Sequence, residues 1–115
     1  MMLNGFYRTY QLSHSHSLSS GYALQCSAGG KGATGYVDFS FKLNGKSINT
    51  SCALDESEIS IYDCQTYLAG KYFPVIYNPD NPSNAKMLMS VNDFKKYGYD
   101  FPDSLHWVLN YIKKR

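Results

Sequence analysis

The chain has 115 residues, 43% of them hydrophobic, which suits one compact domain over residues 1–115 and is too short for two. Its 11 basic and 9 acidic residues give a net charge of +2, too small to predict nucleic-acid or anionic-membrane binding by long-range electrostatics. No run approaches the ~20 apolar residues of a membrane span, and Met1 to Phe6 is too short and uncharged for a secretory signal. We expect a soluble, cytoplasmic domain, or a periplasmic or envelope-associated one if an upstream segment precedes it.

Two strands are expected before residue 30, at Phe6 to Leu12 and at Tyr22 to Ser27, with a polar run over residues 13–21 between them. His14 and His16 would face one side of an extended chain, but no third His or Cys ligand lies near them in sequence. We therefore expect a solvated loop there and no metal site. The glycine-rich residues 28–32 lack the spacing of a phosphate-binding loop and predict a flexible turn.

The strongest local prediction is a β-hairpin centred on Asn44-Gly45, because this pair favours the type I′ turn that joins two antiparallel strands. Polar and apolar residues alternate from Tyr36 to Leu43 before the turn, and the second strand follows from Lys46. With a two-residue loop, the register pairs Phe41 with Ile48, Phe39 with Thr50 and Val37 with Cys52. These side chains share one face, and a slip by one residue would turn them to water.

After the hairpin, Asp55 to Glu58 has the pattern of a capping box, which predicts a short helix over about residues 56–68, ended by Gly70. The β-branched and aromatic residues in this segment leave an extended conformation open. Lys71 to Tyr77 predicts a strand at a sheet edge or a bulge, because Pro74 cannot donate to a ladder.

The rest of the chain predicts a proline-rigidified turn over residues 78–82 and a short strand over residues 85–89. Asn92 or Asp93 should cap a brief helical turn ended by Gly98. Asp103 should cap a terminal α-helix with an apolar stripe of Leu105, Val108, Leu109 and Ile112. Together the elements predict a mainly β (α+β) fold: a small curled antiparallel sheet or SH3/OB-like barrel of five to six strands with a C-terminal α-helix.

Three cysteines, Cys26, Cys52 and Cys64, lack the C-x-x-C spacing of a zinc site. One disulfide plus one thiol is compatible with them, but we favour three reduced thiols that serve as small core residues.

No set of residues predicts catalysis. Asp103, Ser104 and His106 have the residue types of a hydrolytic triad, but neighbouring positions on a helix point in different directions. Glu56 and Glu58 lie in the same expected cap. We therefore expect no enzyme activity and no cofactor.

Tyrosine is over-represented, with 11 residues. Tyr suits both β-strands and protein interfaces, so packing and partner binding both explain the excess. Aromatic residues beside loops are our candidate partner-binding residues: Tyr72, Tyr97, Tyr99, Asp100 and Trp107.

Three features stand out between Tyr36 and Leu88: a strand that ends in Leu43-Asn44-Gly45-Lys46, the Gly70 to Pro82 segment with its Lys-Tyr-Phe-Pro-Val-Ile-Tyr-Asn-Pro-Asp-Asn-Pro run, and the following Ala85 to Leu88. With these features the segment resembles a bacterial family of small envelope-associated β domains of unknown function. The closing Phe101 to Val108 segment is similar to that of short proteins of Bacteroidetes-type bacteria. The resemblance implies turn geometry and a β fold, and it supplies no catalytic residues.

We therefore expect a protein-binding module, most concretely an immunity or inhibitor protein that binds and blocks a bacterial toxin or effector. The alternative is an accessory envelope-associated domain of a membrane complex. An enzyme or a nucleic-acid-binding barrel is a third, weaker interpretation, kept because OB-like barrels bind single strands on aromatic platforms.

Overall fold

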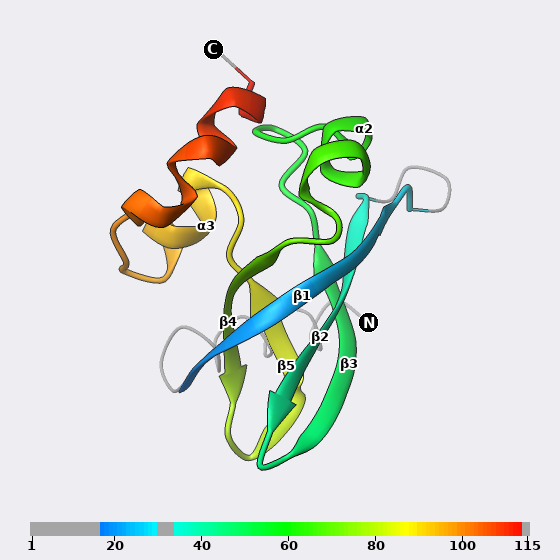
Figure 1. The fold of residues 1–115 in the computed structure, drawn as a ribbon, viewed down its shortest axis with the longest axis vertical. Coiled ribbons are helices and arrows are strands. Elements are labelled where there is room, and N and C mark those ends of the chain that lie inside the picture. Colours follow the sequence, from blue (N-terminus) through cyan, green and yellow to red (C-terminus); the bar gives the residue numbers. More distant parts are fainter. Residues whose placement is uncertain (1–16, 30–33, 114–115) are drawn as a thin grey trace.

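The computed structural model describes residues 17–29 and 34–113. Five strands form one sheet in the order β3-β2-β1-β4-β5, in which every paired ladder is antiparallel (Figure 1). The strands are β1 (Ser17–Ser27), β2 (Tyr36–Leu43), β3 (Lys46–Ala53), β4 (Tyr72–Asn78) and β5 (Asn81–Met87). The predicted mainly β fold is confirmed. The expected strand at Phe6 to Leu12 and the pair His14 and His16 lie outside the described residues, and so does part of the glycine-rich turn.

The sheet curls until its two edge strands, β3 and β5, lie against each other. The Thr50 hydroxyl donates to the Ser83 carbonyl at 2.9 Å, and Lys86 Nζ donates to the Ala53 carbonyl at 2.6 Å. Both bonds join residues 33 positions apart, so β3 and β5 run in the same direction. The result is a nearly closed five-stranded barrel with the cyclic order β1-β2-β3-β5-β4.

The predicted hairpin is confirmed in its register. Phe41 pairs with Ile48, Phe39 with Thr50 and Val37 with Cys52. Asn44 and Gly45 have φ angles of 53° and 80°, the left-handed values that a type I′ turn requires. The alternation of buried and exposed residues along β2 places Val37, Phe39 and Phe41 inside the barrel.

The barrel interior is filled by side chains of β2, β4 and β5, and one glycine lets β1 and β4 approach. Phe39, Phe73 and Val75 are among the fully buried residues. A Cβ atom on Gly21 of β1 would lie 2.5 Å from Val75 Cγ2. A residue of β1 bulges between Ala23 and Gln25, which increases the local twist of a strand that pairs with both β2 and β4.

The expectation that the proline strand lies at an edge or a bulge is wrong. β4 is an interior strand between β1 and β5, and Pro74 pairs with Ser20. The Pro74 carbonyl accepts from the Leu88 amide at 2.8 Å, on the side of β5. The N–H and C=O of one residue in an antiparallel ladder point toward the same neighbouring strand. The N–H that Pro74 lacks would therefore point toward β5, at the position where β5 ends after Met87. The ladder with β1 therefore loses no bond at Pro74.

Short helices gather at one end of the barrel, while the two hairpin turns lie at the other end (Figure 1). The helical segment between β3 and β4 consists of α2 (Ile61–Asp63) and a π-helical turn over Cys64–Leu68. It begins later than predicted, because Ser60 is the residue that caps it, through a hydroxyl that accepts from the Asp63 amide. Gly70 follows its end with a φ of 88°, as expected.

The predicted capping box at Asp55 to Glu58 is wrong, because neither carboxylate caps the helical segment that follows it. Asp55 accepts from the Ser57 amide and holds a local turn instead of a helix. The Glu58 carboxylate accepts from the amide of Asn92 at 2.6 Å, in the first turn of α3 (Val91–Lys96). It therefore satisfies a free amide of a helix 34 residues further along the chain.

α3 has its own capping box, in which the Ser90 hydroxyl accepts from the Asp93 amide and the Asp93 carboxylate accepts from the Ser90 amide. The cap is therefore Ser90, and the prediction of Asn92 or Asp93 is wrong by a few positions. Gly98 follows the helix with a φ of 83°, so the predicted stop is confirmed.

The terminal helix is present, but Asp103–Tyr111 consists of two 3-10 segments that meet at a kink at Leu105 (φ −107°, ψ 15°), with Pro102, not Asp103, at the N-cap. Leu105 and Val108 are buried, whereas Leu109 is exposed. The predicted α-helical stripe is therefore only half buried.

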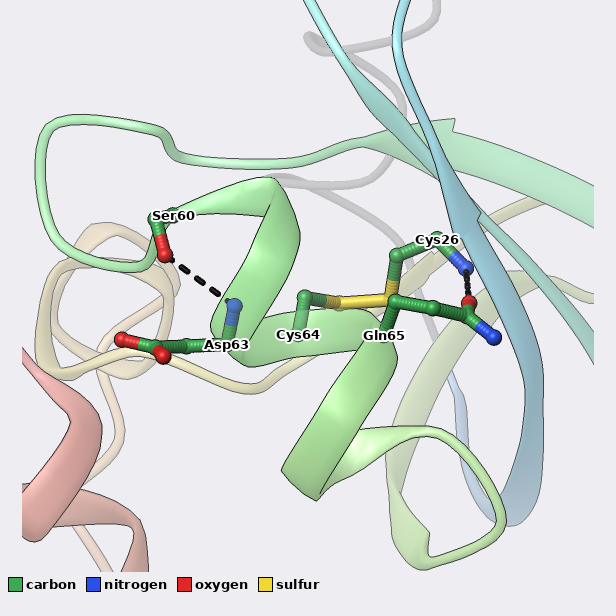
Figure 2. Close-up of a disulfide and its surroundings, with 5 residues drawn as sticks. All are labelled: Cys26, Ser60, Asp63, Cys64 and Gln65. Atoms are coloured by element: carbon green, nitrogen blue, oxygen red, sulfur yellow. Dashed lines mark hydrogen bonds between the residues drawn. A yellow bond between two sulfur atoms is a disulfide. The ribbon is translucent and has the colours of Figure 1, made fainter.

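The prediction of three reduced cysteines is wrong. Cys26 at the end of β1 and Cys64 at the start of the π-helical turn form a disulfide with Cα atoms 5.9 Å apart (Figure 2). The Cys26 amide also donates to Gln65 Oε1 at 2.7 Å. The disulfide and this hydrogen bond fix the helical segment against the barrel wall.

Candidate functional site

An open groove of about 690 Å³ lies at the helical end of the barrel, where three segments meet. The segments are the π-helical turn, the start of β4 and the terminal 3-10 helix. We call this feature the aromatic groove; it is lined by Thr66, Tyr67, Lys71, Tyr72, Ser104, Leu105, Trp107 and Tyr111.

Three aromatic side chains of the groove, Tyr67, Tyr111 and Trp107, contact one another in that order. Tyr67 and Tyr111 stack with centroids 4.3 Å apart and planes inclined by 16°. Trp107 meets Tyr111 edge to face at 6.4 Å, and its other side lies 6.0 Å from the buried ring of Phe73. The indole is therefore held between the core and the solvent, which fixes its orientation before any ligand arrives.

Tyr72 also lines the groove and is the most exposed of its described aromatic residues, with 65% of its surface accessible. Its ring packs edge to face against Tyr22 of β1 at 5.1 Å. Two neighbouring hollows also include Tyr72, and they extend the apolar surface over β1 to the exposed side chains of Leu18 and Leu24. Tyr72 thus joins the groove to the outer face of β1.

The backbone around the groove is fixed by the same contacts that hold the fold. The amide of Gly70 donates to the Ala23 carbonyl at 2.7 Å, and the amide of Ala23 donates to the Lys71 carbonyl at 2.9 Å. The Cys26–Cys64 disulfide lies three residues before Tyr67. The groove is therefore anchored to β1 on the sides of both Tyr67 and Tyr72.

The polar side chains of the groove are five hydroxyls, one indole and one ammonium. Among the described residues that line it, Lys71 is the only charged one, and none has a carboxylate or carboxamide side chain. The indole N–H of Trp107 and the ammonium of Lys71 donate only, while hydroxyls of Tyr, Ser and Thr both donate and accept.

The structure brings together only two of the five candidate residues of the sequence, Tyr72 and Trp107. Tyr97 and Tyr99 are half-buried beside α3, and Asp100 is exposed in the following loop. The backbone amide of Tyr99 donates to the Phe94 carbonyl at 2.9 Å. These three residues do not line the groove.

Tyr97 belongs instead to a charged cluster at the seam between β3 and β5. Lys86 Nζ lies 3.5 Å from the Asp93 carboxylate. Burial lowers the pKa of Lys86, but its interactions with Cys52, Asp93 and Tyr97 outweigh burial, so the pKa is raised. Burial, with Asp93, raises the pKa of Tyr97 against the opposing effect of Lys86. Through Lys86, the cluster links β5 to β3 and to α3 where the barrel closes.

Sequence reasoning missed Tyr67 and Tyr111, the stacked pair of the groove. The available signal was their type: both are aromatic residues in short helices. Their contact joins residues that lie far apart in sequence and depends on the π-helical turn and the 3-10 helix. Neither geometry is specified by an α-helical pattern.

The outer face of β2 and β3 is the surface that OB barrels use for strands and sugars. Here it carries mostly short polar side chains, among them Ser40, Asn49 and Ser51. Two exposed rings, Tyr67 and Tyr72, line the aromatic groove together with the partly buried Trp107 and Tyr111, which makes the groove the stronger candidate.

Within residues 17–29 and 34–113, no cluster of His, Cys, Asp and Glu has the arrangement of a metal site. In the same part of the chain, no helix is long and apolar enough to cross a membrane.

No protein-family model, no curated protein and no solved structure matches this chain. The resemblance of the Gly70 to Pro82 segment to an envelope-associated β family therefore stays a prediction.

Proposed function

We propose that this chain is a non-catalytic binding module that holds another protein in the aromatic groove. The observation that carries the proposal is the grouping of Tyr67, Tyr72, Trp107 and Tyr111 around one open groove. Tyr and Trp are enriched at the centres of protein interfaces, because they offer large contact area and lose little rotamer entropy on binding.

Preorganisation is the second support. Trp107 is packed against Phe73, and Tyr67 is stacked on Tyr111, so these rings are already ordered in the chain without a partner. A partner that enters the groove avoids part of the entropic cost of ordering side chains. Such a site favours tight binding for its area.

The Cys26–Cys64 disulfide bears on the compartment. Disulfides persist in oxidising environments and are rare in the reducing cytosol. We therefore propose that the module works in the periplasm or at the envelope, the alternative to the cytoplasmic location that the sequence favours.

Within this class, an immunity or inhibitor protein that blocks a toxin or effector is the most specific version of the proposal. The accessory envelope domain is its alternative. A stable 1:1 complex with the product of a neighbouring toxin gene on size exclusion supports the inhibitor, and its absence together with co-purification of a membrane complex supports the accessory domain.

Site-specific photocross-linking tests the proposed function. Tyr67, with 41% of its surface exposed, is replaced by p-benzoylphenylalanine in the native organism. The matched control carries the same replacement at Tyr62, which is 71% exposed on the preceding helical turn and does not line the groove. We expect one cross-linked protein from position 67 and none from position 62.

The captured protein is then purified and titrated against two variants. Tyr72→Ala should weaken its binding by about tenfold or more, and Tyr62→Ala should leave it unchanged. Equal cross-linking at both positions, or an affinity that is indifferent to Tyr72→Ala, rules the groove out as the binding site.

A further inference from the structure

We infer that the aromatic groove accepts a proline-rich segment in the polyproline II conformation. This inference rests on the proposed function, because it names the kind of protein segment that the groove binds. It follows from the sheet edges, the shape of the lining side chains and the hydrogen-bonding character of the groove.

Recognition by strand addition is not offered at this site. β4, the strand that borders the groove, is paired with β1 on one side and β5 on the other. The two edge strands, β3 and β5, face each other and are bridged from Thr50 to Ser83 and from Lys86 to Ala53. A partner segment at the groove must therefore bind through side chains and not by extending the sheet.

The shape of the lining residues favours a partner segment that presents flat proline rings over one that presents an amphipathic helix. An amphipathic helix inserts several aliphatic anchors into a broad apolar groove. Among the described residues of the groove, Leu105 is the only aliphatic one, and it is buried. The remaining apolar surface consists of the faces and edges of Tyr67, Tyr72, Trp107 and Tyr111. Pyrrolidine rings of a polyproline II segment pack on aromatic faces of this kind, which is the mode used by domains that bind Pro-x-x-Pro segments.

The polar groups of the groove complement such a segment. A polyproline II chain has no internal hydrogen bonds, so its carbonyl oxygens are free acceptors, and each proline lacks an N–H. The groove supplies donors that can reach such acceptors: the Trp107 indole and the Lys71 ammonium, which only donate, and the hydroxyls of the lining Tyr, Ser and Thr residues. A segment with free carbonyl oxygens can therefore be hydrogen-bonded at this surface.

An oligosaccharide is the other ligand class that OB barrels bind. Its hydroxyls could pair with the lining hydroxyls of the groove. The titration therefore includes an oligosaccharide as the competing outcome.

Intrinsic fluorescence tests the inference, since Trp107 is the only tryptophan of the chain and lines the groove. The intact protein is titrated with decaproline and with a set of ten-residue peptides that contain Pro-x-x-Pro. A Gly-Ser peptide of the same length and a cello-oligosaccharide are the controls. We expect a saturable change with at least one proline-rich peptide and none with either control.

Variants locate the binding. Tyr72→Ala should weaken the proline-rich peptide by about tenfold, and Tyr62→Ala should leave it unchanged. Thermal unfolding of each variant verifies that the fold is retained. Saturation by the oligosaccharide and not by the peptides would overturn the inference, and so would peptide binding that is insensitive to Tyr72→Ala.

Failure of this inference is distinguishable from failure of the proposed function. If no proline-rich peptide binds, while the cross-linked protein still loses affinity in Tyr72→Ala, the groove is a protein site for another kind of segment and only the inference is overturned. If neither the peptides nor the captured protein depend on Tyr72, both are overturned.

Discussion

Gly21 shows how one residue determines the spacing of two strands. A Cβ at this position would lie 2.5 Å from Val75 Cγ2 and 3.1 Å from the Met87 side chain, both in the core. We predict that Gly21→Ala lowers the free energy of unfolding by about 1–3 kcal/mol, because the core has no room for the methyl group. Urea denaturation measures the loss. Ser20→Ala, on the outer face of the same strand, is the control, and equal losses in the two variants would contradict the packing shown here.

The seam residue Lys86 predicts a loss of stability at alkaline pH. Its pKa is raised above the ordinary value of 10.5, and that of Tyr97 is raised above 10.0. A raised pKa in the folded state stabilises the fold below the unfolded pKa, and this contribution disappears as the pH rises through the folded pKa. We expect the free energy of unfolding to fall above about pH 10, with a smaller fall in Lys86→Met. If the free energy of unfolding falls equally with pH in both proteins, Lys86 does not cause the alkaline loss of stability.

The contribution of Asp55 to folding stability has the opposite pH dependence, since it is lost at acid pH. Burial opposes its ionisation, but hydrogen bonds from Ser57 and Asn92 outweigh burial and lower its pKa below 3.8. A lowered pKa stabilises the fold above the unfolded value, and the contribution is lost as the pH falls through the folded value. We predict that Asp55→Asn flattens the acid limb of stability below about pH 4, measured by urea denaturation at several pH values. An unchanged acid limb would show that Asp55 is equally paired in the unfolded chain.

At the scale of elements, the disulfide is the largest single constraint. It closes a loop between residues 38 positions apart, which corresponds to about 4 kcal/mol from the reduced entropy of the unfolded chain. We predict a loss of this order in the double variant Cys26→Ala/Cys64→Ala. A reductant should destabilise the natural chain and have no effect on the double variant. A reductant effect that persists in the double variant would place the sensitive group elsewhere.

The bond from Glu58 to α3 is a second link between elements. Its carboxylate is buried and accepts from the Asn92 amide. Glu58→Ala leaves that amide without its acceptor, so we expect a loss of about 1–3 kcal/mol. Glu58→Gln retains an acceptor oxygen and should lose less. If urea denaturation gives the same midpoint for both variants, the bond contributes nothing to stability.

Elements whose geometry is set by local chemistry were predictable, and those set by distant contacts were not. The Asn44-Gly45 turn fixes its own register, and Gly70 and Gly98 end helical segments through their left-handed conformation. The interior position of Pro74 depends instead on where β5 ends, and the target of Glu58 depends on the fold that brings α3 beside it. The alternation and capping patterns contain no information on such neighbours.

At the scale of the whole molecule, the contacts that close the barrel and the proposed binding groove lie in different regions. Lys86 of β5 joins the two barrel edges through the Ala53 carbonyl of β3 and pairs with Asp93 of α3, whereas the aromatic groove is lined by the helical segments and the start of β4. Of this arrangement, the sequence predicted a small β barrel, and two of its five candidate partner-binding residues, Tyr72 and Trp107, line the groove. The disulfide that anchors the groove was not predicted, because cysteine spacing alone does not decide pairing.

The most direct test of the central claim is the indole N–H signal of Trp107 in a proton–nitrogen correlation spectrum. The chain has one tryptophan, so this signal is unambiguous. We expect it to shift or broaden when the protein captured from position 67 is added, while the amide signals of Asn49 and Ser51 on the outer face of β3 stay in place. Shifts on β2 and β3 with an unmoved indole signal would contradict the account and place the binding surface on the barrel wall.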